Sequence, residues 1–221
     1  GNAQNISTHL GSVAWLPAEG YNIFLIDYRG YGASDGEPDL DGVHRDSEAA
    51  IAETFRLEGV DPQRVAVFGQ SLGGSLAIEA LARSPERPQV RGLIIEGAFA
   101  GYRRIAQDVL ARTWLTWPVQ VPLAWTFANR HNPEQAIAAL SPMPVLIIHG
   151  EADTLIGADH ARGLYAAAGE PKALWLVAGA PHIAALRTPE MRAGLTAWLT
   201  HCAFAAADDP GRNAACTIPK A

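Results

Sequence analysis

The sequence predicts an α/β fold in which a mostly parallel sheet carries helices on both faces. Short apolar runs of β-branched and aromatic residues alternate along the chain with longer segments whose apolar residues recur at helical spacing. This alternation is typical of strand–helix–strand units and a parallel sheet. The chain has 221 residues, 48% of them hydrophobic and 18% charged, which suits a single globular domain over 1–221 with its own core.

The apolar runs define five candidate strands, and the amphipathic segments define the helices between them. The strands are Asn22–Asp27, Val65–Phe68, Val90–Ile95, Pro144–His149 and Ala173–Val177. The helices are Ile6–Leu16, Val43–Leu57, the segment that begins at Leu72, and the regions 158–168 and 188–200. Because the strands are connected through helices, we expect them to run parallel, with their C-terminal ends at one edge of the sheet.

The stretch RVAVFGQSLGGSLAIEALAR, at 64–83, places a serine on a sharp corner between a strand and a helix. Gly69 and Gly73 flank the corner, where side chains would clash as the strand and the helix pack closely. This is the G-x-S-x-G nucleophile elbow, which predicts Ser71 as a nucleophile. The N–H of Leu72 then becomes a donor of an oxyanion hole. A tight turn that carries a serine by accident is the alternative.

A serine nucleophile needs a general base, and the base needs an acid that orients it. Asp153 follows the strand PVLIIHG, and His182 follows the strand ALWLV. Both would lie at the same sheet edge as Ser71, in the chain order serine, acid, histidine. Glu151 and Glu96 are rival acids, because each also follows a predicted strand.

Other polar residues receive weaker assignments. We expect Asp108 to be a solvated helix residue and His149 to be a packed structural histidine. A peptidase would need a polar group that holds the substrate terminus, and Glu96, Arg103 and Arg104 are weak candidates for that role.

The segment 101–140 contains no predicted strand and is longer than an ordinary connection. It contains Trp114, Trp117 and Trp125. We expect a small helical cap over the C-terminal edge of the sheet, where ligands bind in α/β folds. The tryptophans would line an apolar acyl pocket and, if exposed, would contact a membrane surface. Ordinary core packing of these aromatic residues is the alternative.

The net charge of −6 argues against nucleic acid as a partner. No run of eighteen apolar residues is present, so we expect no transmembrane helix.

Cys202 and Cys216 either form a disulfide, which would be typical of an exported or membrane-associated protein, or are two free thiols. They have neither C-x-x-C nor metal-ligand spacing, and the expected chemistry needs no cofactor and no metal.

Several motifs resemble those of the α/β-hydrolase superfamily, in particular small bacterial serine hydrolases of the esterase/lipase and serine-aminopeptidase-like groups. They are GNAQN at the start, DYRGYGASDG at 27–36, GQSLGG at 69–74, HGEADTLI at 149–156 and PH at 181–182. The resemblance covers nearly the whole chain except its last twenty or so residues. It implies that the N–H of Asn2 is the second donor of the oxyanion hole.

The chain departs from the superfamily in its number of strands. The family sheet has eight strands, whereas five are predicted here, and the family's strand order leaves a slot between Asn22–Asp27 and Val65–Phe68. Unpaired backbone groups along such a slot are unfavourable. We therefore expect an upstream segment of the same protein to complete the sheet, and the 221 residues alone not to fold. The alternative is a rearranged sheet in which these two strands pair directly with each other.

Together these features predict a serine hydrolase that cleaves carboxylic esters of a small-molecule acyl substrate through an acyl-enzyme. The same triad also serves peptidases, amidases and thioesterases. A non-catalytic binding protein built on this fold is the second class considered.

Overall fold

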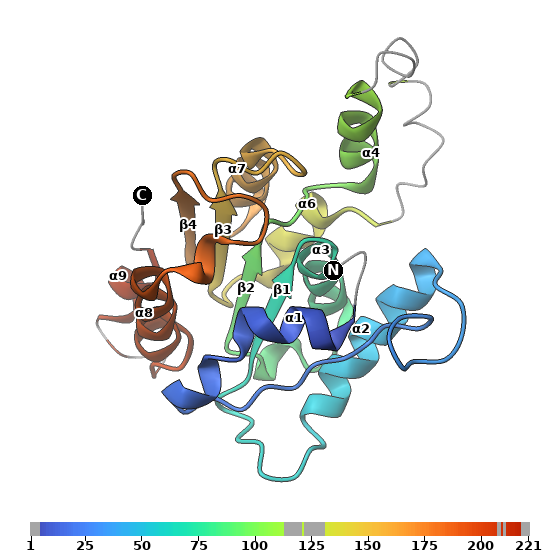
Figure 1. The fold of residues 1–221 in the computed structure, drawn as a ribbon. Coiled ribbons are helices and arrows are strands. Elements are labelled where there is room, and N and C mark those ends of the chain that lie inside the picture. Colours follow the sequence, from blue (N-terminus) through green and yellow to red (C-terminus); the bar gives the residue numbers. More distant parts are fainter. Residues whose placement is uncertain (1–4, 113–120, 122–130, 207–208, 210, 218–221) are drawn as a thin grey trace.

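The computed structural model describes residues 5–112, 121, 131–206, 209 and 211–217. Four parallel strands form one sheet in the order β1-β2-β3-β4 (Figure 1). Their bounds are Ala66–Gln70 for β1, Gly92–Glu96 for β2, Val145–Gly150 for β3 and Lys172–Val177 for β4. The predicted fold class, an open parallel sheet covered by helices, is confirmed.

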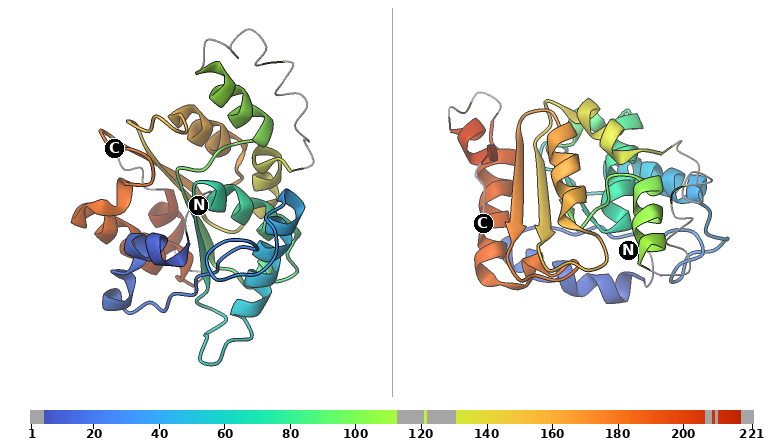
Figure 2. Two further views of the ribbon diagram at one scale, coloured as in Figure 1. Left: turned by 45° about the vertical axis from the view of Figure 1, so that its right-hand side comes forward. Right: turned by 90° about the horizontal axis from the view of Figure 1, so that it is seen from above.

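Helices cover both faces of this sheet, as Figure 2 shows from above. One face packs on α2 (Leu40–Thr54), α3 (Leu72–Arg83) and α7 (Ala158–Ala167), and the other packs on α8 (Pro189–Trp198) and α9 (Arg212–Thr217). The strand residues divide between the faces with a period of two: Leu93 and Ile95 join the first core cluster, and Ile94 joins the second. The remaining α-helices of the described residues are α1 (Ile6–Val13), α4 (Tyr102–Ala111) and α6 (Pro133–Ala136).

Capping residues decide where two of the helices begin. The Asp39 side chain accepts a hydrogen bond from the N–H of Gly42, so α2 begins at Leu40 rather than at the predicted Val43. Thr188 caps α8 by accepting from the N–H of Met191, and Pro189 occupies the first helical position. Sequence periodicity located these helices, and the caps fix their first residues.

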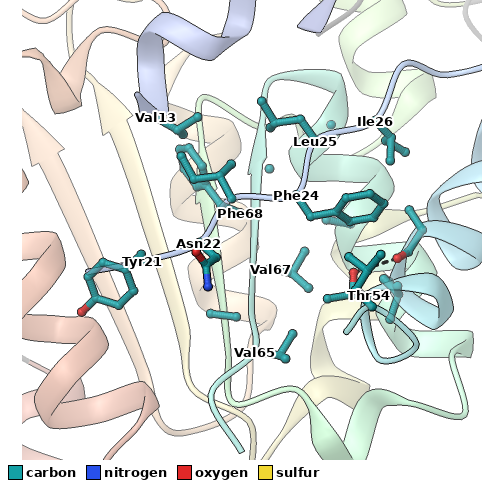
Figure 3. A pocket seen from close by; sticks show the side chains of 18 of the residues that line it. Val13, Tyr21, Asn22, Phe24, Leu25, Ile26, Thr54, Val65, Val67 and Phe68 are labelled. Carbon is teal, nitrogen blue, oxygen red and sulfur yellow. Dashed lines mark hydrogen bonds between the residues drawn. The ribbon is translucent and has the colours of Figure 1, made fainter. Parts of the chain in front are cut away.

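The prediction of a strand at Asn22–Asp27 is wrong. This segment has no strand assignment, and among the described residues β1 pairs with β2 alone. A pocket of about 660 Å³ separates the segment from β1. Figure 3 shows side chains from both walls around it, including Phe24 and Leu25 on one side and Val67 and Phe68 on the other. The apolar pattern of Asn22–Asp27 favours an extended backbone, but a strand also needs hydrogen bonds to a neighbouring strand. This segment does not pair with β1, so the alternative of direct pairing between the two is not what the structure shows.

The helix α4 stands apart from the two layers that cover the sheet (Figure 1). Arg104 forms an ion pair with Asp159 at the start of α7, with an N–O distance of 2.6 Å. Asp108 is partly exposed on α4, as expected of a solvated helix residue, but its carboxylate also lies 2.7 Å from Nε2 of the buried His160. The three tryptophans of the predicted acyl pocket lie outside the described residues, namely Trp114, Trp117 and Trp125.

None of the helices in the described ranges has the length and apolar character needed to cross a bilayer.

The two cysteines form a disulfide, which decides between the two alternatives that the sequence left open. Cys202 and Cys216 are both fully buried, and their sulfur atoms are 2.05 Å apart. Both belong to the core cluster between the sheet and α8. The bond therefore fastens the short helix α9 onto this layer.

We expect the disulfide to stabilise the fold measurably. It closes a loop with a sequence separation of 14, for which the loss of chain entropy in the unfolded state corresponds to about 3 kcal/mol. Urea unfolding with and without dithiothreitol should show a difference near that value in the free energy of unfolding. The Cys202→Ser/Cys216→Ser variant is the control and should not respond to dithiothreitol; a wild-type protein that does not respond either would contradict the expectation.

Candidate active site

The corner between β1 and α3 holds Ser71 in a backbone conformation that non-glycine residues rarely adopt, with φ 54° and ψ −125°. The close packing of the strand against the helix explains why. A Cβ atom on Gly69 would lie 2.5 Å from the carbonyl oxygen of Gly73, and one on Gly74 would lie 2.8 Å from Cβ of Ala98. With no room for side chains there, the chain turns within one residue.

The structure corrects one detail of the predicted elbow. A Cβ on Gly73 would meet only the hydroxyl of Tyr28, at 3.6 Å, which is ordinary van der Waals contact. The two glycines that the close approach requires are Gly69 and Gly74, one residue beyond the end of the five-residue motif. The spacing of the motif alone does not reveal which of the later glycines has no room for a side chain.

The three residues that the sequence predicts as a triad lie together at the C-terminal edge of the sheet. Nε2 of His182 is 3.0 Å from Oγ of Ser71, and Nδ1 of His182 is 2.6 Å from Oδ2 of Asp153. In the arrangement that suits catalysis, Nδ1–H donates to the carboxylate and the serine hydroxyl donates to Nε2. Ser71, Asp153 and His182 follow β1, β3 and β4, respectively. Because these strands are parallel, residues that are far apart in the sequence meet at one edge of the sheet.

The Asp153 carboxylate is held in a fixed orientation. Its side chain is fully buried, and Oδ1 accepts hydrogen bonds from the N–H groups of Leu155 and Ile156, at 2.8 and 2.9 Å. Oδ2 is left to face His182. The buried His149 lies 3.4 Å from the same oxygen, and burial lowers its pKa. His149 is therefore a neutral packed histidine whose Nε2 donates to the carbonyl of Ile156.

The loop that carries His182 crosses the ends of β3 and β2 before it reaches Ser71. Glycines stand at both crossings. A Cβ on Gly150 would lie 2.1 Å from the carbonyl oxygen of Ala180, and one on Gly97 would lie 3.3 Å from the imidazole of His182. Gly97 also has φ 61°. Sequence reasoning did not single out these two glycines, although Gly150 directly follows a predicted strand and Gly97 comes two residues after the end of another, and this position is the signal that identifies them.

The N–H of Leu72 lies at the first position of α3, where the helix itself offers no acceptor carbonyl. It directly follows Ser71, which is the position of an oxyanion donor in a nucleophile elbow. Asn2, the residue expected to supply the second donor, lies outside the described residues.

The two rival acids do not face His182. Glu151 is half-exposed and lies 3.8 Å from Arg162. Glu96 is 1% exposed, and its carboxylate accepts from Gln70 and from the backbone after His182. Neither replaces Asp153 as the partner of the histidine.

One further cluster contains residue types that bind metals. His44, Glu79 and His131 are buried and bring ligand atoms within 4.8 Å of one another. However, the two imidazoles are stacked with centroids 3.6 Å apart and planes 9° apart, so their in-plane lone pairs cannot converge on one ion. Arg83 also contacts both Glu79 and His131. Burial, with the nearby charges of His131 and Arg83, lowers the pKa of His44 to about 3, so this cluster fits a hydrogen-bonded network.

A four-stranded parallel sheet with a serine elbow, an acid and a histidine at one edge defines an α/β hydrolase. A profile of the family described as "Serine aminopeptidase, S33" matches residues 3–137. The chain therefore belongs to this family of α/β hydrolases, and the resemblance seen in its motifs is confirmed.

Relatives and solved structures agree with this assignment. The chain is 37% identical over 183 residues to the uncharacterized protein YfhR of Escherichia coli, covering 83% of this chain and 61% of the relative. It is 31% identical to the α/β hydrolase domain-containing protein WAV2 of Arabidopsis thaliana, covering 76% and 55%. The Pyrococcus furiosus esterase Pf2001 has the same fold, with a TM-score of 0.67 at 22% identity over 88% of this chain and 76% of that one. The chain thus spans about three fifths of the curated relatives it matches.

We expect Gly69→Ala to destabilise the protein strongly, because the added methyl group meets backbone atoms of α3 that have no room to move. The loss should be about 2 kcal/mol or more, measured as a lower midpoint in thermal unfolding. Gly73→Ala is the matched control: its methyl group has space and alanine favours helix. Equal destabilisation by both substitutions would contradict the assigned packing.

Proposed function

We propose that this protein hydrolyses carboxylic esters through an acyl-enzyme formed on Ser71. The observation that carries the proposal is the continuous line of contacts from Ser71 through His182 to Asp153, at a helix N-terminus where the N–H of Leu72 has no acceptor within the helix. Membership of a hydrolase family supports it, as does the fold shared with esterases.

In the proposed mechanism, Oγ of Ser71 attacks the ester carbonyl while Nε2 of His182 takes the hydroxyl proton. The Leu72 N–H, with Asn2 as the proposed second donor, stabilises the developing oxyanion, each donor contributing about 3 kcal/mol. His182 then gives its proton to the leaving alcohol. Water, deprotonated by His182, attacks the acyl-enzyme, and the collapse of this second intermediate releases the acid and restores the serine hydroxyl. Asp153 stabilises the imidazolium in both halves of the reaction.

An ester substrate is favoured over a peptide by the surroundings of Glu96. This carboxylate was a candidate to hold a peptide terminus, but it is 1% exposed and its two oxygens are occupied by Gln70 and Ala185. Arg104, another candidate, is paired with Asp159. Peptidase, amidase and thioesterase activity use the same triad and remain the alternatives that a substrate panel separates, as does a non-catalytic binding role.

We also propose that the acyl chain of the substrate lies under the segment 101–140, with Trp114, Trp117 and Trp125 as its apolar contacts. Helix α4, which opens this segment, is fastened over the C-terminal edge by Arg104 and Asp108. That position is where ligands bind in open α/β sheets. Short- to medium-chain esters and lipid-like molecules are the corresponding substrate class.

An activated serine should react with a fluorophosphonate, and Ser71→Ala should abolish the reaction. Intact-mass spectrometry of both proteins after exposure to the probe measures this directly. Hydrolysis of p-nitrophenyl butyrate should fall by about 10³-fold or more in the variant. An unlabelled wild-type protein would reject the proposal in favour of a binding role.

The same preparations, given aminoacyl p-nitroanilides and acyl thioesters beside the p-nitrophenyl esters, test the substrate class. We expect the highest kcat/KM for esters. A preference for the anilides that Ser71→Ala removes would assign the triad to a peptidase instead.

The pocket beside β1 leads to a second proposal, which concerns the strand that pairs with the free edge of β1. We propose that an extended strand from residues N-terminal to this chain, in the same protein, lies between β1 and the segment Asn22–Asp27. The first described residues, Asn5 and Ile6, line this pocket, and the Ile6 N–H donates to Asp27 at the end of the segment. A chain that enters at this point is able to continue directly into the pocket.

The backbone of β1 supports a strand as the occupant. Ser71 N–H donates to the carbonyl of Glu96, and the Val65 carbonyl accepts from Arg91, so the odd-numbered residues of β1 face β2. Because successive residues of a strand direct their N–H and C=O groups to opposite sides, Ala66, Phe68 and Gln70 present theirs to the pocket. A parallel or antiparallel strand is the partner that satisfies such an edge along its length.

Hydrogen exchange of the β1 amides tests this occupant. In the 221-residue chain, the N–H groups of Ala66, Phe68 and Gln70 should exchange faster than those of Val67 and Gly69, which face β2, or all five should exchange rapidly where the chain does not fold alone. In a longer form that carries the proposed N-terminal strand, all five should be protected. NMR of the two forms measures each amide, and unchanged exchange at the three pocket-facing amides would overturn the proposal.

A further inference from the structure

A buried carboxylate contacts both the strand that precedes Ser71 and the loop that follows His182, but it is not part of the triad. Glu96 is the last residue of β2, is 1% exposed, and is paired in register with Gln70, the residue before Ser71. Its backbone carbonyl accepts the N–H of Ser71 at 2.9 Å. Burying a carboxylate is costly unless hydrogen bonds compensate, so its partners indicate what it does.

Both oxygens of Glu96 are occupied, one by the strand that precedes Ser71 and the other by the loop that follows His182. Oε2 accepts from the side-chain amide of Gln70 at 2.6 Å, and Oε1 accepts from the backbone N–H of Ala185 at 2.9 Å. Burial raises the pKa of the Glu96 carboxyl, while the bonds from Gln70, Ala185 and Leu186 and the charge of His182 act in the opposite direction. The carboxylate thus joins the strand that carries Ser71 to the loop that carries His182.

The loop held by Glu96 contains a strained residue. Ile183, directly after His182, has φ 47°, a region that is unfavourable for a β-branched side chain. Such conformations cost about 1–3 kcal/mol and persist only where the surroundings enforce them. Hydrogen bonds to the backbone of Ala185 and Leu186, two and three residues further on, are positioned to enforce this one.

We infer that Glu96 is a positioning residue of the proposed esterase. By accepting from Gln70 on one side and from the backbone after Ile183 on the other, it fixes the separation of Ser71 Oγ and His182 Nε2 at hydrogen-bonding distance. The inference rests on the proposed function, and it goes beyond it by assigning a role to a fourth side chain that does not touch the substrate. Displacement of a catalytic group by about 1 Å lowers a rate by about 10²-fold.

Three variants test this role. Glu96→Ala removes both acceptors. Glu96→Gln retains an amide oxygen for Ala185, and its amide nitrogen is able to donate to Gln70 once the Gln70 amide is flipped. Glu151→Ala removes a carboxylate from the end of the next strand, where it is half-exposed and 3.8 Å from Arg162. All three are compared with wild type by circular dichroism and by kcat and KM for p-nitrophenyl butyrate.

We expect Glu96→Ala to lower kcat by about tenfold to a hundredfold, with KM within about threefold of wild type, because the substrate contacts are untouched. Glu96→Gln should recover kcat to within about fivefold of wild type, and Glu151→Ala should have wild-type values. If Glu96→Ala does not fold, Glu96→Gln beside Gln70→Ala gives the same comparison, and Gln70→Ala should then lower kcat without raising KM.

Wild-type kcat in Glu96→Ala would overturn the inference, and so would a Glu96→Gln protein that folds but loses as much kcat as Glu96→Ala. In the latter case the charge of the carboxylate, rather than its hydrogen bonds, would be what matters. Labelling of the wild type by a fluorophosphonate separates this result from failure of the proposed function, since an unreactive wild type would reject the function itself.

Discussion

The geometry of the whole site depends on the close approach of β1 and α3 at Ser71. Because a Cβ on Gly69 would lie 2.5 Å from backbone of the helix, the chain has no room for a loop and turns through a single residue with φ 54°. That turn places the serine at the C-terminal edge of the sheet, directly before the first N–H of α3. A longer connection would relieve the strain, but it would also free the serine from the helix N-terminus.

The other two members of the triad reach this point because the strands are parallel. Ser71 follows β1 and His182 follows β4, at opposite sides of the four-stranded sheet, so the histidine loop must pass over the ends of β3 and β2. Gly150 and Gly97 leave the space for that passage. Asp153 projects from the end of β3, which lies beneath the path of the loop, and meets Nδ1 of His182 from there. The acid lies on an intermediate strand, where a short loop is enough to reach the histidine.

Local patterns predicted the elements that depend on local information. The strands β1 to β4, the elbow at Ser71 and the polar residues after the strands are all visible as periodicity, glycine spacing and chain order. The sequence does not show which segments pair as strands or which distant side chains meet. Asn22–Asp27 has the composition of a strand but lacks a hydrogen-bonded neighbour. Asp108 has the position of a solvated residue and is partly exposed, but it also meets His160 across 52 residues of chain. A side chain at Gly74 rather than at Gly73 would clash, because its Cβ would lie 2.8 Å from Cβ of Ala98. Glu96 was a rival to Asp153 in the sequence because both residues follow a predicted strand. The hydrogen bonds that the buried Glu96 carboxylate accepts from Gln70 and Ala185 distinguish it from Asp153, which faces His182.

Gln70 links the site to the unpaired edge of β1. Its side chain donates to Glu96, and through it to the histidine loop, while the alternation of the strand directs its backbone N–H and C=O groups into the pocket beside β1. Three of the five residues of β1 therefore lack backbone partners on that side within the described part of the chain, and the last of them directly precedes Ser71. Backbone groups without partners allow a strand end to fray. Under the two proposals, a strand that filled the pocket would hold Gln70 from the side opposite Glu96, and completion of the sheet and alignment of Ser71 with His182 would depend on the same residue.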